Sequence, residues 1–321
     1  MKNLFLLLFC VLFSITMFGQ GAGKLTMSPE HPMPGETITI TYEVGDSPLK
    51  DAAVFDAIVY LSNEDKFRAE QFELKKVGQH YTGEVQTKSN DQLISFYFEE
   101  FDTDNKDDNN KKGYISMLYK EDRSTPVQGA YYQMGKCFAG RALGYSVDRD
   151  WDKCIAHFQK EFAAYPSSKN NLDLLSNYNF YASRAKNEGA KADLLSIANQ
   201  LKKEKKSEDK LWTAYTIFET QGSETDQEEL GALLKQKYPK GELAKKEAMD
   251  ALNEAFKAKD FALAEAKYAA YVGLLDLDNK EDVDDKNFYA IITGYRMINS
   301  GGDPEKIKEF YEKGKGYTES T

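Results

Sequence analysis

The sequence predicts a multidomain β + α fold, in which an N-terminal immunoglobulin-like β-sandwich is followed by tetratricopeptide-like helical hairpin repeats. Three observations predict this arrangement. A short apolar run opens the chain, a hydrophobic period of two follows, and the period becomes 3.6 near Thr125, where alanine, leucine, lysine and glutamate dominate. We therefore expect a signal peptide over 1–20, a sandwich over 21–124 and a helical domain over 125–321.

The first twenty residues predict export. Lys2 supplies a positive charge, Leu4–Phe13 form an apolar run, and the chain then turns small and polar before a cleavage site expected between Gly19 and Ala22. The run is too short for a membrane span, and Cys10 lies inside it, which disfavours a lipoprotein site. We expect an exported mature protein, periplasmic or associated with the cell surface, with no part inserted in a membrane.

The region from Lys24 to about Lys120 has the pattern of short strands. The clearest is TITITYEV at Thr37–Val44, where apolar residues alternate with threonine and glutamate, so one face is apolar and the other polar. Gly78-Gln79 fits a tight turn between two later candidates. Those candidates are Ala53–Leu61, Ala69–Val77, His80–Gln86, Leu93–Phe101 and Tyr114–Tyr119. Six or seven short strands in this length predict an immunoglobulin-like sandwich.

The remainder of the chain has helical periodicity, with Pro126 and Gly129 at the boundary. Short loops between helices of this length predict helical hairpins. The expected helices are Tyr132–Tyr145, Arg149–Tyr165, Asn171–Asn187, Ala190–Lys205, Ser207–Thr220, Thr225–Tyr238, Glu242–Ala258, Phe261–Leu275, Lys286–Ser300 and Pro304–Lys313.

A weak internal repeat supports the hairpins. The segment RALGYSVDRDWDKCIAHFQKEFAAYP is similar to one tetratricopeptide unit, with Tyr145 closing the first helix, Phe158 inside the second and Pro166 ending it. A second unit ends in KQKYPKGE, and a third, KDFALAEAKYAAYV, has Ala264 and Tyr268 at packing positions. Each hairpin leaves an apolar face exposed, so we expect stacked hairpins to share a core.

Composition excludes several partners. The 321 residues carry a formal charge of -10. Nucleic acids and anionic membrane surfaces require a basic face, so we expect neither as a partner. Aromatic residues make up 13% of the chain, which indicates a folded protein with a substantial core.

Two cysteines remain after the expected cleavage, Cys137 and Cys154. Export permits a disulfide between them. We place Cys137 near the start of one helix and Cys154 early in the next, antiparallel one. This offset separates their Cα atoms beyond the roughly 7 Å that a disulfide tolerates. The sequence therefore favours two buried, reduced thiols, with the disulfide as the alternative.

No catalytic, cofactor-binding or metal-binding residue emerges. His31, His80 and His157 lack metal-ligand spacing, and C-x-x-C, H-E-x-x-H and G-x-S-x-G motifs are absent from the sequence. GAGK, residues 21–24, lacks the first glycine and the Ser or Thr of a phosphate loop. We predict no catalytic activity, no cofactor and no metal.

Acidic and aromatic clusters suggest weaker alternatives. Asp102 and Asp104 match the first ligands of a calcium loop, but later positions do not, so we favour a solvated loop. Glu99 and Glu100 are adjacent and would point to opposite faces of a strand, so they cannot flank one glycosidic bond. Six helical tyrosines fit a core or, as an alternative, a peptide groove: Tyr131, Tyr132, Tyr178, Tyr181, Tyr268 and Tyr271.

Three segments together resemble a known family. PGETITITY, DNNKKGYISMLY and GAYYQMGKCFAGRALGYSVDRDWDKCIAHFQKEFAAYP are similar to the N-terminal half of exported thioredoxin-like (TlpA-type) proteins of the Bacteroidota. The resemblance implies an immunoglobulin-like domain and tetratricopeptide-like helices ahead of a thioredoxin-fold oxidoreductase domain. That domain carries the C-x-x-C of the family and would begin near GKGYTEST. Neither Cys137 nor Cys154 matches it, so no catalytic residue carries over.

These observations leave two main hypotheses for function. The first is an exported, non-catalytic binding or scaffolding protein of the bacterial cell envelope, which contacts an envelope protein or peptide through its helical repeats. The alternative is the accessory N-terminal half of a thioredoxin-like thiol–disulfide oxidoreductase, with the catalytic domain lost or encoded separately. A hydrolase with an unrecognised site is the remaining possibility.

Overall fold

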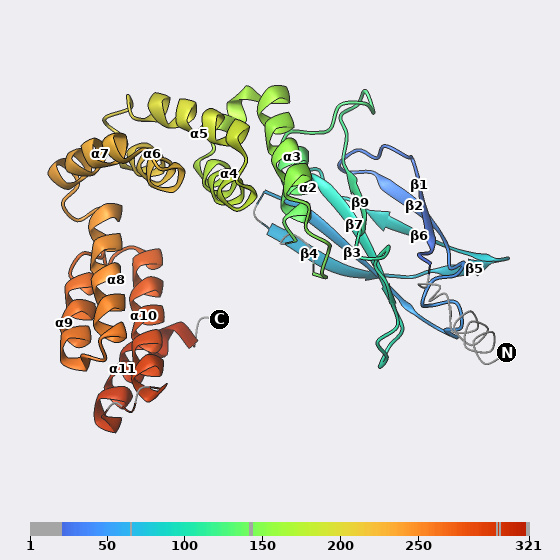
Figure 1. Ribbon diagram of the computed structural model, residues 1–321. Helices are drawn as coiled ribbons and strands as arrows, with labels where there is room; N and C mark the ends of the chain where they lie inside the picture. The colour runs from blue at the N-terminus through green and yellow to red at the C-terminus, as the bar shows by residue number, and fades with distance from the viewer. Residues whose placement is uncertain (1–20, 65, 141–143, 300, 302, 319–321) are drawn as a thin grey trace, which may run out of the picture. The chain divides into compact units, whose positions relative to one another are not determined.

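The computed structural model describes residues 21–64, 66–140, 144–299, 301 and 303–318 (Figure 1). The expected signal peptide over 1–20 lies outside these residues. The chain divides into two compact units, Met1–Ala190 and Lys191–Thr321. The first unit contains the described strands and the helices that follow them directly, and the second contains the later helices.

The strands of the first unit form two antiparallel sheets, in the described part of the chain with orders β1-β2-β6-β5 and β4-β3-β7-β8, and β9 also pairs with β7. Their bounds are β1 Lys24–Ser28, β2 Thr37–Glu43, β3 Asp56–Asn63, β4 Lys66–Phe72, β5 Lys75–Val77, β6 His80–Gln86, β7 Leu93–Glu99, β8 Lys106–Asp107 and β9 Tyr114–Met117. The prediction of β-structure followed by helices is therefore confirmed.

One predicted strand proved to be two. The segment Ala69–Val77 contributes to both sheets, because β4 pairs with β3 while β5 pairs with β6. The chain crosses between the sheets at Glu73-Leu74. The prediction of one uninterrupted strand over Ala69–Val77 was therefore wrong. The Gly78-Gln79 turn is confirmed, since Val77 pairs with His80 and Gly78 has a φ of 66°.

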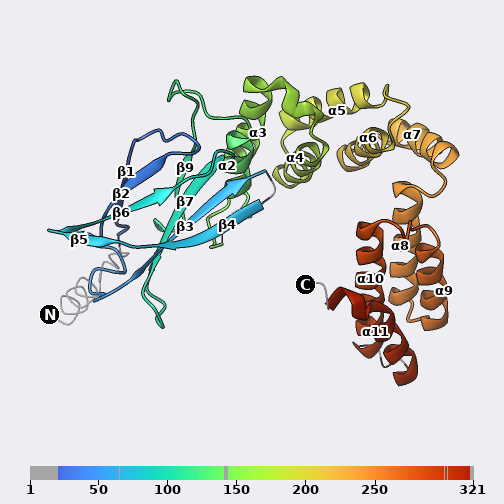
Figure 2. The same ribbon diagram turned by 180° about the vertical axis from the view of Figure 1, so that it is seen from behind.

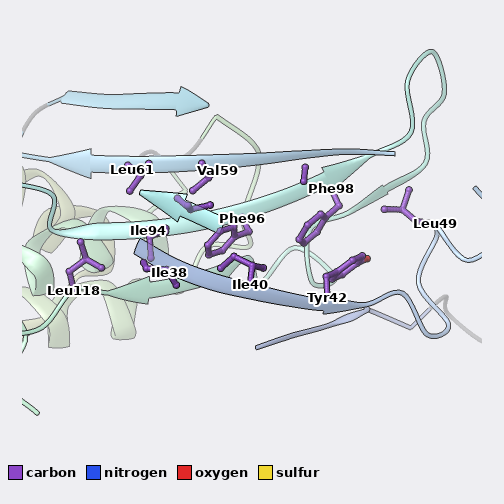
Figure 3. Packing of buried hydrophobic residues seen from close by; sticks show 12 residues of the cluster. Ile38, Ile40, Tyr42, Leu49, Val59, Leu61, Ile94, Phe96, Phe98 and Leu118 are labelled. Atoms are coloured by element: carbon purple, nitrogen blue, oxygen red, sulfur yellow. The ribbon is translucent and has the colours of Figure 1, made fainter. Parts of the chain in front are cut away.

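A hydrophobic core fills the space between the two sheets (Figure 3). Ile38, Ile40 and Tyr42 come from β2 and face Phe96 and Phe98 from β7. The rings of Tyr42 and Phe98 stack with their centroids 3.9 Å apart. Fully burying each of these side chains contributes roughly 1.5–3 kcal/mol, so this alternation of apolar residues determines which face of β2 points inward.

The described part of the chain after Thr125 is helical, as the hydrophobic periodicity predicted. Consecutive helices pack together as α2 with α3, α6 with α7, α8 with α9, and α10 with α11. Their bounds are α2 Ala130–Phe138, α3 Trp151–Ala164, α4 Leu172–Ala185, α5 Glu188–Leu201, α6 Glu208–Gln221, α7 Glu224–Lys237, α8 Glu242–Lys257, α9 Phe261–Val272, α10 Lys280–Asn299 and α11 Pro304–Thr318, with a 3-10 helix η1 at Pro166–Asn170. Within the described residues, none of these helices is long and apolar enough to cross a membrane.

Helix α2 is shorter than predicted. It ends at Phe138, and Gly140 follows with a φ of 75°, a left-handed conformation that favours glycine and stops the helix. Tyr145 therefore does not close the first helix, as the repeat pattern suggested. Its hydroxyl lies 2.5 Å from Ser95 Oγ and donates to the carbonyl of Phe96 at 3.1 Å, so the side chain packs on the sheet.

Both faces of strand β7 are covered. One face points into the sandwich core, while Leu93 on the other packs against Met134 and Cys137 of α2. Tyr97 stacks on Tyr145, with 4.9 Å between ring centroids. Figures 1 and 2 show α2 beside β7 and β9 from opposite sides. This double cover explains why LISFYFE is almost continuously buried.

The second unit has its own core. Leu252 of α8, Ala264 and Tyr268 of α9, Met297 of α10 and Phe310 of α11 are buried against one another. Tyr268 contacts Phe310 edge to face, with centroids 5.2 Å apart. Ala264 and Tyr268 thus occupy the packing positions that the sequence predicted.

Candidate functional site

A groove of about 730 Å³ in the second unit is the strongest candidate site. Helices α6, α8, α9 and α10 form its walls. The lining residues are Trp212, Glu242, Lys245, Lys246, Met249, Tyr271, Glu281, Asp282, Asp284, Asp285 and Tyr289. Carboxylates outnumber lysines on this surface, and three aromatic rings lie among them. The groove therefore combines negative charge with aromatic surface.

The start of α10 supplies most of the acids. Acidic side chains in a first helical turn interact favourably with the positive end of the helix dipole, which suits Glu281 and Asp282. Asp282 accepts the Asp276 backbone N–H at 2.7 Å and pairs with Lys245 at 2.9 Å. Burial raises the pKa of Asp282, but the Asp276 hydrogen bond and the Lys245 ammonium outweigh it, so the pKa lies below its ordinary value. Asp282 is therefore ionised and already paired.

The two lysines of the groove are also engaged. Lys245 Nζ pairs with both Asp282 and Glu242, the latter at 3.1 Å. Lys246 Nζ lies 3.1 Å from Glu219 and 3.1 Å from Asp250. Of the carboxylates that line the groove, the two lysines thus pair with Glu242 and Asp282.

Three carboxylates of the groove have no ion-pair partner among the described residues. These are Glu281, Asp284 and Asp285, and Asp285 Oδ2 accepts only a hydrogen bond from the Tyr271 hydroxyl at 3.3 Å. Burial, followed by the charge of Asp285, raises the pKa of Tyr271 well above its usual range. The same two causes raise the pKa of Tyr289. Both phenols therefore stay neutral at ordinary pH, and the negative charge remains on the carboxylates.

The aromatic rings of the groove are held in place by packing. Trp212 stacks on Tyr215, with an interplanar angle of 12° and 5.5 Å between centroids. Tyr271 and Tyr289 meet edge to face at 5.3 Å. Aromatic faces beside carboxylates attract guanidinium and ammonium groups through cation–π and charge-assisted contacts. The arrangement is suited to lysine or arginine side chains.

The tyrosines singled out in the sequence are mainly core residues. Five of the six are buried, and Tyr178 and Tyr181 pack against the fully buried Phe158. The buried five are Tyr132, Tyr178, Tyr181, Tyr268 and Tyr271. They form the core rather than a groove, as the favoured interpretation held. Of the six, Tyr271 is the one that borders the acidic groove.

Both cysteines are free and buried, as expected, although the geometric reason was wrong. Cys137 lies in the last turn of α2, not near its start, and packs against Leu93 of the sheet. Cys154 lies early in α3, and its carbonyl is near Gly135 on a different face of α2. Burial raises the pKa of both thiols to about 12. Few thiolates therefore form at neutral pH, which disfavours redox chemistry at either position.

The three histidines lie in different parts of the first unit, and each has local packing or hydrogen-bond contacts. His31 stacks on Tyr119 at 4.4 Å, and His80 begins β6. His157 Nδ1 lies 2.7 Å from the carbonyl of Lys153, and burial lowers its pKa. Among the described residues, no group of three or more His, Cys, Asp or Glu side chains is placed to hold a metal ion.

The loop that resembled a calcium site has a different role. Asp102 and Asp104 are exposed, whereas Asp107, at the position where calcium loops have glycine, is buried. Asp107 Oδ2 accepts hydrogen bonds from the Tyr42 hydroxyl at 2.6 Å, the Tyr114 hydroxyl at 3.0 Å and the Gly23 N–H at 2.7 Å. This carboxylate of β8 therefore joins the residue before β1 to β2 and β9, and Gly23 of GAGK belongs to the same network.

A second buried carboxylate supports the turn before β7. Asp91 binds the Arg68 guanidinium through both oxygens, at 2.5 and 2.8 Å, and also accepts the Lys88 N–H at 2.7 Å. The hydrogen bond to Asp91, opposed by burial, raises the pKa of Arg68. Asp91 thus has a structural role.

Sequence reasoning did not identify the acidic groove. Its one linear signal is the run EDVDD at 281–285, while Trp212 and Glu242 come from distant helices. Comparison of the sequence with protein-family models and with curated proteins finds no match.

Proposed function

We propose that this chain is an exported, non-catalytic binding protein of the cell envelope that recognises a lysine- or arginine-rich segment of a partner protein in the α6–α8–α9–α10 groove. The β region would be an immunoglobulin-like domain and the helices tetratricopeptide-like repeats. Two antiparallel sheets with a shared core and the consecutive packed helix pairs support these assignments. Helical repeats commonly offer extended surfaces to peptides.

One observation carries the proposal. Glu281, Asp284 and Asp285 stand without ion-pair partners in the described residues, beside the rings of Trp212 and Tyr289. Unpaired carboxylates attract cations over distances near the Debye length, about 8 Å at physiological salt. Neighbouring aromatic faces then favour desolvated cationic side chains over simple ions. A basic peptide satisfies both demands at once.

The thiols do not favour the oxidoreductase alternative. A catalytic thiol needs a lowered pKa and exposure to its substrate. Cys137 and Cys154 have raised pKa values and are buried. The two thiols are suited to packing, and a binding role agrees better with the groove.

The test uses the mature full chain and a fluorescent peptide in which lysine alternates with alanine. We expect binding that weakens as salt rises, and no binding of the matching glutamate peptide. The double variant Glu281→Gln/Asp284→Asn should lower the affinity about tenfold, because two charges of the groove are lost. The control Glu228→Gln/Glu312→Gln removes the same charge from exposed positions outside the groove and should change affinity less than about twofold. Equal losses in both variants would show that net charge, not the groove, attracts the peptide.

A further inference from the structure

A second cavity lies in the first compact unit, between one end of the sheets and the first helices. Its volume is about 320 Å³. The loops around Glu64 and Gln92, the start of α2, and parts of α3, η1 and α4 form its walls. A volume near 300 Å³ is the lower end of the range for small-molecule sites, so this cavity would hold a small molecule rather than a protein segment.

The unusual group in this cavity is the carboxylate of Glu161. The side chain comes from α3 and is 0% exposed. Its Oε1 accepts the Gly129 N–H at 3.0 Å and the Ser168 hydroxyl at 2.8 Å, and both donors belong to cavity-lining residues. Its Oε2 has no hydrogen-bond partner in the described part of the chain. A buried acceptor left unpaired is costly, and Glu161 lines the cavity, so a ligand bound there would supply the missing donor to Oε2.

The neighbouring protein donors are directed elsewhere. Gln128 Nε2 donates to Ser168 Oγ at 3.2 Å, and Gln92 Nε2 donates to the carbonyl of Gln128 at 3.0 Å. The lining residues include the two carboxylates of Glu64 and Glu161 but no lysine, arginine or histidine. The cavity therefore lacks a positive charge of its own.

Charge, size and lining define the kind of ligand. An ammonium group offers three N–H donors and one positive charge to a single carboxylate. A divalent metal would need further acidic or histidine ligands, and the described residues contain no such group of three. Tyr132 and Leu174 provide apolar wall for a short carbon chain. We infer that this cavity binds a small primary amine, whose ammonium group donates to Oε2 of Glu161.

The inference is independent of the peptide groove, because every lining residue of the cavity lies in the first unit. The probe is n-butylammonium chloride, with n-butanol and tetramethylammonium chloride as controls. Butanol has the same chain without the charge, and tetramethylammonium has the charge without N–H donors. We expect butylammonium at about 10 mM to raise the melting temperature of the full chain by about 2 °C, and the two controls to leave it unchanged.

Two variants assign the effect to the cavity. Glu161→Gln keeps the size and one acceptor but removes the charge, and should weaken butylammonium binding at least about tenfold. Ser167→Phe places a large side chain at an exposed position on the rim, where it removes only the 3.3 Å hydrogen bond from Gln128 Nε2, and should block entry. Saturation-transfer NMR on folded protein measures both affinities directly. An equal response to butanol, or unchanged binding in Ser167→Phe, would overturn the inference.

Discussion

The carboxylates of the two compact units lie in opposite surroundings. Asp91 and Asp107 in the first unit are each about 1% exposed and bound by several donors. Glu281, Asp284 and Asp285 in the second border an open groove and lack ion-pair partners among the described residues. Burial with full hydrogen bonding therefore gives an acid a structural role, while exposure without an ion-pair partner leaves it available to a ligand.

Glu161 shares features with both groups. It is as buried as Asp107, and one of its oxygens is bound by two donors. Its other oxygen has no hydrogen-bond partner among the residues described, and the groove acids likewise lack ion-pair partners there. It is therefore the buried acid for which we infer a ligand.

Replacement of Asp107 should have the largest effect on the free energy of unfolding. Replacing Asp107 by alanine leaves the hydroxyls of Tyr42 and Tyr114 without their acceptor inside the sandwich. We expect a loss of about 3 kcal/mol in the free energy of unfolding. Reaction of Cys137 and Cys154 with a thiol reagent measures it, because both cysteines lie in the first unit and react only on opening.

The labelling rate in Asp107→Ala should rise roughly 100-fold if opening and closing are fast relative to labelling. Asp104→Ala is the matched control, since Asp104 lies in the same loop but is exposed. Similar rates in both variants would contradict a structural role for the buried carboxylate.

Replacement of Glu36, a partly exposed acid of the same unit, should have a smaller effect on stability. The Arg123 guanidinium and the Met33 N–H hold the pKa of Glu36 below its ordinary value. Ionised Glu36 therefore stabilises the folded state. Because its pKa is lower in the folded state, this stabilisation is complete above the unfolded pKa of about 4.3 and is lost as pH falls through the folded pKa.

Glu36→Gln should cost about 1 kcal/mol or less near pH 7, and the difference from the unsubstituted protein should shrink below about pH 4. Urea midpoints measured from pH 7 to about pH 3 check this. A difference that stays constant with pH would show that ionisation of Glu36 is not the cause.

The smallest effect on stability should come from the groove. Glu281→Gln/Asp284→Asn should change the free energy of unfolding by no more than about 0.5 kcal/mol, because neither side chain has an ion pair within the described residues. Urea unfolding followed by tryptophan fluorescence measures it. A loss above about 1 kcal/mol would show that these acids are structural groups, like Asp107.

The sequence predicted elements best where local periodicity decides the structure. His80–Gln86 was predicted with the bounds it has, and α8 differs from its prediction by one residue. Prediction failed where tertiary packing decides. The break at Glu73-Leu74 depends on which sheet each half joins, and the end of α2 depends on Gly140 and on the contact of Tyr145 with the sheet.

The candidate sites were less predictable than the fold. The groove needs α6, α8, α9 and α10 side by side, and no short motif signals that assembly. The role of Asp107 depends on hydroxyls from Tyr42 and Tyr114, of which the first is 65 positions away. The burial of both cysteines and the place of Cys154 early in its helix were predicted, but the place of Cys137 in the last turn of α2 was not.

The double cover of β7 affects how the protein can be divided into fragments. A fragment that ended at residue 124 would lose α2 and Tyr145, and would expose the outer face of β7 around Leu93 and Tyr97. An uncovered apolar face on a sheet promotes association between copies. A fragment made for recombinant expression, or transferred to another protein, should therefore fold and stay monomeric only when it contains both the strands and the helices up to about residue 190.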